Sequence, residues 1–223
     1  AALPFANDAI DQVILGNVLS AGIGQAPARQ AALAAKIPPS VGAITVNKVC
    51  GSGLAAVMLA DQAIRAGDSR LVVAGGMENM SLAPHLVMEA RQGWKFGNQT
   101  VLDSMLHDGL WCAYENTGMG VLADYTAAKH QISRGDQDAF SVESHVRAIA
   151  AREGKMFAPE IVPVKVKGTR EETIVEHDEG PPALVDRDAG RRPDPHQGVV
   201  HRPLQFAAVE HQLRGEAQHM RRG

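Results

Sequence analysis

Residues 41–68, VGAITVNKVCGSGLAAVMLADQAIRAGD, combine a strand pattern, a glycine-rich turn and a helical pattern in one continuous stretch. The run Val41 to Val49 is mostly apolar and rich in β-branched residues, which predicts a strand. From Gly53 to Ala66 apolar residues recur at three- and four-residue steps, which predicts a helix, and Gly67 supplies its stop. Leu71 to Ala74 then predicts a strand buried on both faces. Strand, helix and strand in this order form a βαβ unit with parallel strands and a right-handed crossover.

The alternation of strand and helix patterns continues on both sides of this unit. Upstream, residues 11–19 predict a strand, and the Ala-rich residues 25–36 predict a helix with Pro27 in its first turn. Downstream, the sequence predicts helices at 120–131 and 133–152 and an edge strand at 160–167. The predicted fold class is therefore α/β.

Composition excludes several classes of protein without selecting a function. The 223 residues carry a net charge of −3, too little of either sign to indicate a nucleic-acid or anionic-membrane partner. No apolar run approaches the roughly 18 residues that a membrane helix needs, and no secretory signal pattern is visible. Two cysteines, Cys50 and Cys112, fit a reducing compartment better than a disulfide scaffold. We expect a globular, cytoplasmic protein without nucleic-acid or membrane partners.

The sequence changes character after Gly180. The segment 181–223 contains seven arginines and no lysine, and it shows little helical or strand periodicity. One interpretation is a disordered basic tail that binds a polyanion, although five acidic residues offset most of its charge. The other is a segment translated out of frame from a GC-rich gene. At the other end, the start on Ala1 suggests a trimmed beginning.

The chemistry concentrates in residues 47–53, NKVCGSG. Cys50 stands where a buried strand is expected to end and a helix to begin, and the unpaired amides and helix dipole at that point favour a thiolate. Gly51 and Gly53 leave the sulfur accessible, and nearby amides are placed to hold a thioester oxygen as it becomes an oxyanion. The alternative is a small structural cysteine packed under a glycine-rich turn. Spacing alone leaves both open.

Longer segments carry a family resemblance. The motif NKVCGSG at 47–53 is followed by AGGMENMS at 74–81, and the similarity extends through DSMLHDGLWCAYE at 103–115. Over residues 5 to 180 the chain resembles the thiolases, the family of acetyl-CoA acetyltransferases and 3-ketoacyl-CoA thiolases. The resemblance implies the N-terminal half of the layered thiolase fold, in which βαβ units surround a mixed, largely parallel buried sheet, together with part of the loop domain.

The resemblance also implies a reaction. Cys50 matches the family's nucleophile, which carries the acyl group during thiolytic cleavage of a 3-ketoacyl-CoA or condensation of two acetyl-CoA molecules. The implied enzyme is an acetyl-CoA C-acyltransferase of fatty acid metabolism that uses acyl-CoA and CoA as substrates. No metal or other cofactor is implied, and the intact family member is expected to form a homo-oligomer, a dimer or tetramer.

The sequence also departs from the family pattern. Thiolases use an activating histidine and a second cysteine, in a Cys–x–Gly–Gly segment, from their C-terminal half, and neither motif occurs here. The family's opening strand and helix are absent as well. We therefore expect a truncated chain that is inactive alone. The alternatives are a non-catalytic fragment, or another thioester enzyme of the superfamily such as a relative of the ketoacyl synthases.

Resemblance assigns further positions. Leu110 and Met119 match apolar positions of the substrate tunnel, although either fits an ordinary core as well, while Gly118 stands where many relatives have histidine. Residues 94–96 match a loop that mediates dimer–dimer contacts. His85 and Cys112 are interpreted as structural, Cys112 as a core residue.

The predicted domains are the thiolase core at 1–81, a loop-domain segment with core helices at 82–180, and the non-family tail at 181–223. Because each thiolase subunit joins two similar halves, we also expect one half alone to expose an apolar face.

Overall fold

The computed structural model describes residues 6–167 and 172–177. The chain divides into two compact units, Ala1–Ser133 and Arg134–Gly223, which are described separately. The domain boundary predicted at residue 81 lies inside the first of these units and stays a prediction. The predicted tail, 181–223, lies outside the described residues.

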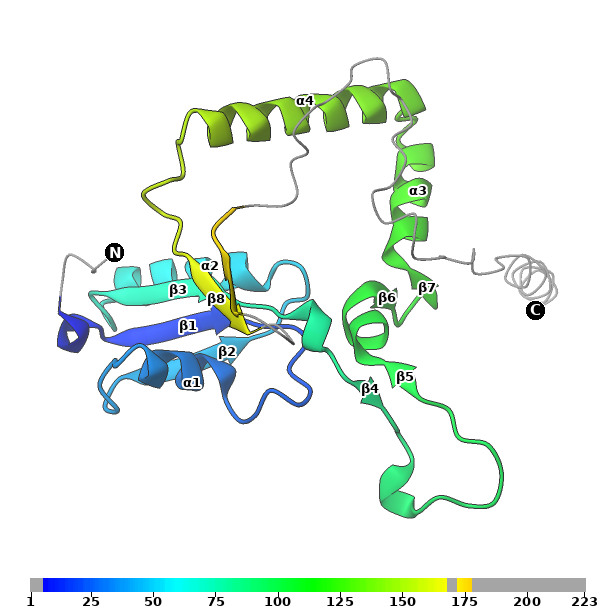
Figure 1. Cartoon of the computed structure of the whole chain (residues 1–223), viewed down its shortest axis with the longest axis horizontal. Helices are drawn as coiled ribbons and strands as arrows, with labels where there is room; N and C mark the ends of the chain where they lie inside the picture. Colours follow the sequence, from blue (N-terminus) through cyan, green and yellow to red (C-terminus); the bar gives the residue numbers. More distant parts are fainter. Residues whose placement is uncertain (1–5, 168–171, 178–223) are drawn as a thin grey trace. The chain divides into compact units, whose positions relative to one another are not determined.

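A parallel three-stranded sheet forms the centre of the first unit (Figure 1). Its strands are β1 (Gln12–Gly16), β2 (Gly42–Val46) and β3 (Val72–Gly76), in the spatial order β2-β1-β3. In register, Ile14 of β1 lies between Ile44 of β2 and Ala74 of β3. β1 and β2 are shorter than the ranges predicted from the sequence, whereas β3 starts one residue later than predicted and extends to Gly76. The α/β class predicted from the sequence is confirmed.

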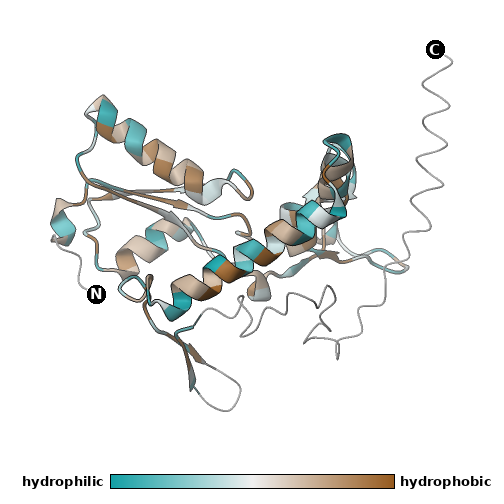
Figure 2. Ribbon diagram, turned by 90° about the horizontal axis from the view of Figure 1, so that it is seen from above, coloured by the Kyte–Doolittle hydropathy of each residue, from teal (hydrophilic) through white to brown (hydrophobic). Residues whose placement is uncertain are grey.

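Two helices cover opposite faces of this sheet, α1 (Pro27–Ala34) on one and α2 (Ser52–Ala66) on the other (Figures 1 and 2). The connection through α1 moves from β1 outward to β2, and the connection through α2 returns across β1 to β3. Because right-handed crossovers in opposite directions place their helices on opposite faces, this arrangement follows from the strand order. Beyond α2, Gly67 adopts a φ of 83° and its N–H bonds the Ile64 carbonyl, which confirms the predicted stop.

The buried core of the first unit lies between α1 and the sheet. It is a cluster of small and branched apolar side chains, and α2 adds Ala56 and Ala60 from the other face. The middle strand β1 is mostly buried, whereas β3 is half-buried except at its exposed last residue, Gly76. The prediction of a third strand buried on both faces is thus wrong for the described residues, because β3 is an edge of the described sheet. The core cluster comprises Ile10, Val13, Ala32, Ile37 and Val41.

The rest of the first unit is built from short elements. After two 3₁₀ turns (Met80–Leu82 and Ala90–Gln92) and a pair of two-residue strands comes a π-helix, which leads into a second short hairpin and a longer helix. A further 3₁₀ turn, Asn7–Ala9, precedes β1. The elements are β4 (His85–Leu86), β5 (Leu102–Asp103), the π-helix Met105–Leu110, β6 (Trp111–Cys112), β7 (Thr117–Gly118) and α3 (Met119–Lys129).

The second unit holds α4 (Arg134–Glu153) and an antiparallel pair, β8 (Val164–Lys167) and β9 (Glu172–Val175). The strand predicted at 160–167 begins only after Pro163, which lacks the N–H that a ladder needs. Within the described parts of both units, no helix has the length and apolar character that crossing a membrane requires.

Candidate active site

Cys50 occupies the turn that joins β2 to α2, and its side chain is exposed. The residue before it, Val49, has a φ of 50°, in the left-handed region that β-branched residues rarely enter. A conformation of this kind costs about 1–3 kcal/mol and persists only where the surroundings fix it. The prediction that Cys50 stands on a sharp strand-to-helix turn is confirmed, and the alternative of a buried structural cysteine does not hold for its side chain.

Three hydrogen bonds made by two neighbouring side chains fix this turn. Ser52, only 4% exposed, accepts the Lys48 N–H at 2.9 Å and donates its hydroxyl to the Val49 carbonyl at 2.6 Å. The side-chain oxygen of Asn47 accepts the Val49 N–H at 2.9 Å. Both polar groups of the Val49 backbone are thereby occupied, which supports its unusual conformation.

Glycines let the start of α2 sit directly on the ends of two strands. A Cβ on Gly16, the last residue of β1, would lie 2.5 Å from the carbonyl carbon of Ser52 and 2.6 Å from the Gly53 nitrogen. A Cβ on Gly76, the last residue of β3, would lie 3.4 Å from the Gly53 Cα. Backbone therefore packs on backbone beneath Cys50, and a side chain at Gly16 would force the turn outward.

An open hollow of about 300 Å³ lies beside Cys50. The loops that follow β1 and β3 form its opposite side. Both loops lie at the carboxyl ends of parallel strands, which is where open α/β sheets bind ligands. The sequence pattern indicated Cys50 at this place but not the residues from the other two loops. The hollow is lined by Gly16, Val18, Val49, Cys50, Ser52, Gly53, Gly76, Met77 and Glu78.

Glu78 joins the two loops of that opposite side. Its Oε2 accepts the Val18 N–H at 2.8 Å, and its Oε1 accepts the Leu19 N–H at 3.0 Å. The amide nitrogen of Asn17 donates to Oε1 at 3.1 Å and to the Met77 carbonyl at 3.0 Å. Sequence reasoning could have found this carboxylate only as an acidic residue just past a buried strand, which is a weak signal.

Leu110 and Met119 are not among the residues that line the hollow. They directly flank the Trp111–Gly118 pair that closes one end of the β6–β7 hairpin. Leu110 ends the π-helix and Met119 begins α3, and both are partly exposed. Their place in a substrate tunnel stays a prediction.

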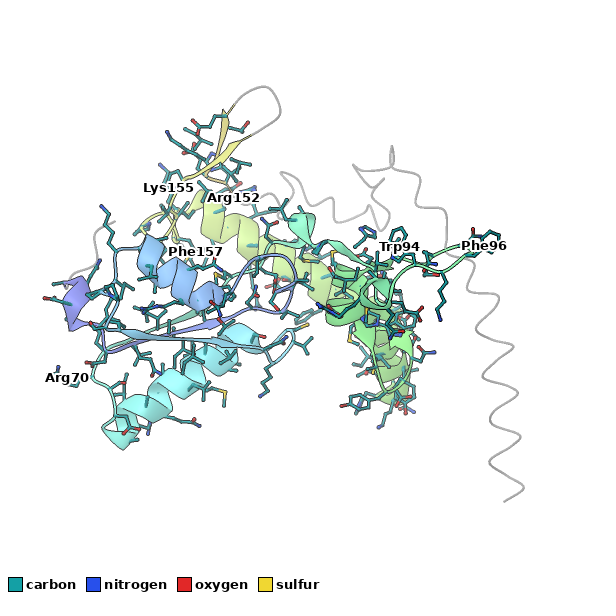
Figure 3. The ribbon with its side chains drawn as sticks, turned by 90° about the horizontal axis from the view of Figure 1, so that it is seen from below. Arg70, Trp94, Phe96, Arg152, Lys155 and Phe157 are labelled. Carbon is teal, nitrogen blue, oxygen red and sulfur yellow. The ribbon has the colours of Figure 1, made fainter. Side chains whose placement is uncertain are left out.

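Other residues named from the sequence lie elsewhere. His85 is exposed in β4. Cys112 is only partly buried in β6 and accepts the Glu115 N–H at 3.4 Å, so it belongs to a hairpin rather than to the predicted core. Trp94 and Phe96 project from the long loop between β4 and β5 (Figure 3). Across residues 6–167 and 172–177, no three His, Cys, Asp or Glu side chains gather as metal ligands.

These features define an α/β protein with an exposed cysteine on a strained strand-to-helix turn, beside a hollow at the carboxyl ends of parallel strands. Residues 2–193 match the family described as "Thiolase, N-terminal domain". The chain therefore belongs to the thiolase family. The matched range ends 13 residues past Gly180, where the sequence changes character.

Relatives and solved structures agree with this assignment. The chain is 54% identical to acetyl-CoA acetyltransferase 2 of Arabidopsis thaliana, over 77% of this chain and 43% of that protein. It is 51% identical to the acetyl-CoA acetyltransferase of Pseudomonas aeruginosa, over 74% of this chain and 42% of that protein. The chain thus spans a little under half the length of these relatives.

Among solved structures, the Acat5 thiolase from Ascaris suum in complex with coenzyme A is similar with a TM-score of 0.73 and 37% identity. That similarity covers 82% of this chain and 46% of the other. The Bacillus anthracis acetyl-CoA acetyltransferase has a TM-score of 0.77 and 33% identity, over 85% and 48% of the two chains. The fold predicted from the sequence is confirmed.

Proposed function

We propose that this chain supplies the nucleophile half of a thiolase-type acyl-CoA acyltransferase, with Cys50 as the residue that carries the acyl group. The observation that carries the proposal is the exposure of Cys50 on its strained turn beside the hollow. The relatives' names, acetyl-CoA acetyltransferase, and the coenzyme A bound to one similar structure support the substrate class.

In the cleavage direction, the Cys50 thiolate attacks the keto carbonyl of a 3-ketoacyl-CoA. The bond between C2 and C3 breaks, the carbanion at C2 takes up a proton, and acetyl-CoA leaves while the acyl group stays on Cys50 as a thioester. The thiolate of a second CoA then attacks this thioester, which releases acyl-CoA and regenerates Cys50. Condensation of two acetyl-CoA molecules is the reverse sequence.

The proposal assigns only part of the catalytic machinery to these 223 residues. By family resemblance, an activating histidine and a proton-carrying cysteine come from outside this sequence. General acid–base assistance is commonly worth 10²–10⁴ in rate. We therefore propose that these residues alone do not turn over acetoacetyl-CoA, and that the whole protein does so as a homo-oligomer. Cytoplasmic location, a role in fatty acid metabolism and independence of a cofactor are further proposals.

Site-resolved alkylation tests the nucleophile. The 223-residue chain is treated with iodoacetamide at pH 7, and the modification of Cys50 and Cys112 is followed by mass spectrometry. We expect Cys50 to react about tenfold faster, since its side chain is exposed while Cys112 lies partly buried in a hairpin.

The Cys50→Ser variant retains only Cys112, so it gives the alkylation rate of Cys112 by itself. Equal rates at the two cysteines would contradict the proposal and favour a non-catalytic fragment. Measurable release of acetyl-CoA from acetoacetyl-CoA and CoA by this chain would contradict its expected inactivity.

A further inference from the structure

The carboxylate of Glu78, an exposed residue, accepts three hydrogen bonds from the loop after β1. Val18 and Leu19 donate backbone N–H groups at 2.8 and 3.0 Å, and Asn17 donates its side-chain amide at 3.1 Å. Hydrogen bonds to an ionised acceptor are about twice as strong as neutral ones. Glu78 therefore holds the loop after β1 against the loop after β3.

Asn17 is fixed in one orientation within this arrangement. It is 4% exposed, and its amide nitrogen donates to both Glu78 and the Met77 carbonyl. Its oxygen, among the described residues, is buried without a hydrogen-bond partner. Rotating the amide would place that oxygen against two acceptors, so the chain accepts one unpaired buried atom to keep both donor contacts.

The two residues whose backbone Glu78 holds have different neighbours. Val18 lines the hollow beside Cys50. Leu19 is buried, and its Cδ2 lies 3.3 Å from the point that a Cβ on Gly109 would occupy. Gly109 belongs to the π-helix that ends at Leu110. Through this loop, Glu78 connects the nucleophile's hollow to the segment that precedes Leu110 and Met119.

We propose that Glu78 is a positioning residue that shapes the acyl-CoA side of the Cys50 site. The inference rests on the proposed function, because it assigns Glu78 a role toward the acyl-CoA substrate that Cys50 would attack. Both of its oxygens accept N–H groups from the loop after β1, so the role assigned to Glu78 is exerted through that loop. Weakening the contact between Glu78 and this loop should slow the reaction of Cys50 with a large reagent of acyl-CoA shape more than its reaction with a small reagent.

The test compares two alkylating reagents at the same sulfur. Bromoacetyl-CoA has the shape of an acyl-CoA, whereas iodoacetamide needs only an accessible thiolate. The ratio of their second-order rate constants at Cys50 cancels changes in the thiolate itself. Glu78→Gln keeps the size of the side chain but removes its charge, and Glu78→Asp keeps the charge but shortens its reach. Glu89→Gln, at an exposed glutamate outside this contact, is the matched control.

We expect both Glu78 variants to lower the ratio about tenfold, in line with the loss of one charged hydrogen bond, while Glu89→Gln leaves it unchanged. A ratio unchanged in both variants would overturn the inference, as would an effect of Glu78→Gln alone, which would indicate charge rather than position. If Glu78→Gln does not fold, Glu78→Asp decides. If Cys50 of the wild-type chain shows no preference over Cys112 for bromoacetyl-CoA, the proposed function itself fails together with the inference.

Discussion

Gly16 at the end of β1 touches the backbone of Ser52 at the start of α2, so closely that a Cβ on Gly16 would lie 2.5 Å from the Ser52 carbonyl carbon. No side chain separates the strand from the helix at this point. The turn that carries Cys50 is therefore placed by contact between two backbones, and its position depends on a residue far away in the sequence.

Gly16→Ala should destabilise the fold. The added methyl group meets backbone rather than a movable side chain, so we expect a loss of about 2–3 kcal/mol in the free energy of unfolding, measured by urea denaturation. Gly42→Ala is the matched control, because a Cβ on Gly42 in β2 would meet nothing within 4 Å. Equal stability of the two variants would show that α2 shifts freely over β1.

Ser52→Ala should weaken the turn itself. It leaves the Lys48 N–H without its acceptor and the Val49 carbonyl without the hydroxyl donor, at a cost of about 1–3 kcal/mol. Because Val49 then loses support for its φ of 50°, we also expect slower alkylation of Cys50 by iodoacetamide. Ser20→Ala, at an exposed serine, should change neither quantity. A stable variant with unaltered Cys50 alkylation would refute the role of Ser52.

Asp11 should make the free energy of unfolding depend on pH under acidic conditions. Its Oδ2 accepts the Arg70 and Leu71 N–H groups at 2.7 and 3.0 Å, and these bonds hold the pKa of Asp11 below its ordinary 3.8. A carboxyl whose pKa is lowered by folding stabilises the folded state above the unfolded pKa, and this contribution is lost as the pH falls through the folded pKa.

Asp11→Asn should therefore lower the urea midpoint at pH 7, and its difference from the wild type should shrink as the pH falls below about 4. Asp8→Asn, at an exposed carboxylate three residues away, is the control. A difference that stays constant over this range would rule out the ionised form of Asp11 as its cause.

The outer face of α2 should cause self-association of the isolated chain. Leu54, Val57, Met58 and Ile64 are exposed at helical spacing, with Leu54 at 68%. We expect concentration-dependent association in analytical ultracentrifugation, reduced by the double variant Val57→Lys, Met58→Glu and unaffected by Gln62→Glu. A clean monomer with a cooperative thermal transition would contradict this expectation.

The encoding DNA decides between the two interpretations of residues 181–223. If the segment is out of frame, translation of another frame after Gly180 should yield a histidine motif and a Cys–x–Gly–Gly segment of the thiolase type. If no frame yields them, the basic tail becomes the better interpretation.

Local signals in the sequence were sufficient for the elements of the first unit. Pro27 at the start of α1 and Gly67 after α2 bracket the two helices as predicted. The same signals overestimated the burial of β3. An apolar run shows that a strand can be buried, but it does not show whether the strand has neighbours on both sides. They also placed Cys112 in the core, although it lies in a two-residue hairpin strand.

For the candidate site, the sequence determined the place of Cys50 and the turn beneath it, since NKVCGSG puts a cysteine, glycines and the serine that holds the turn within a few residues. Tertiary structure alone decided what faces that cysteine. Val18 and Glu78 reach the hollow because β1 and β3 are neighbours in the sheet, although about 60 residues separate them along the chain. A contact of that kind depends on strand order and register, which arise only when the sheet assembles, and no local pattern of residues specifies them.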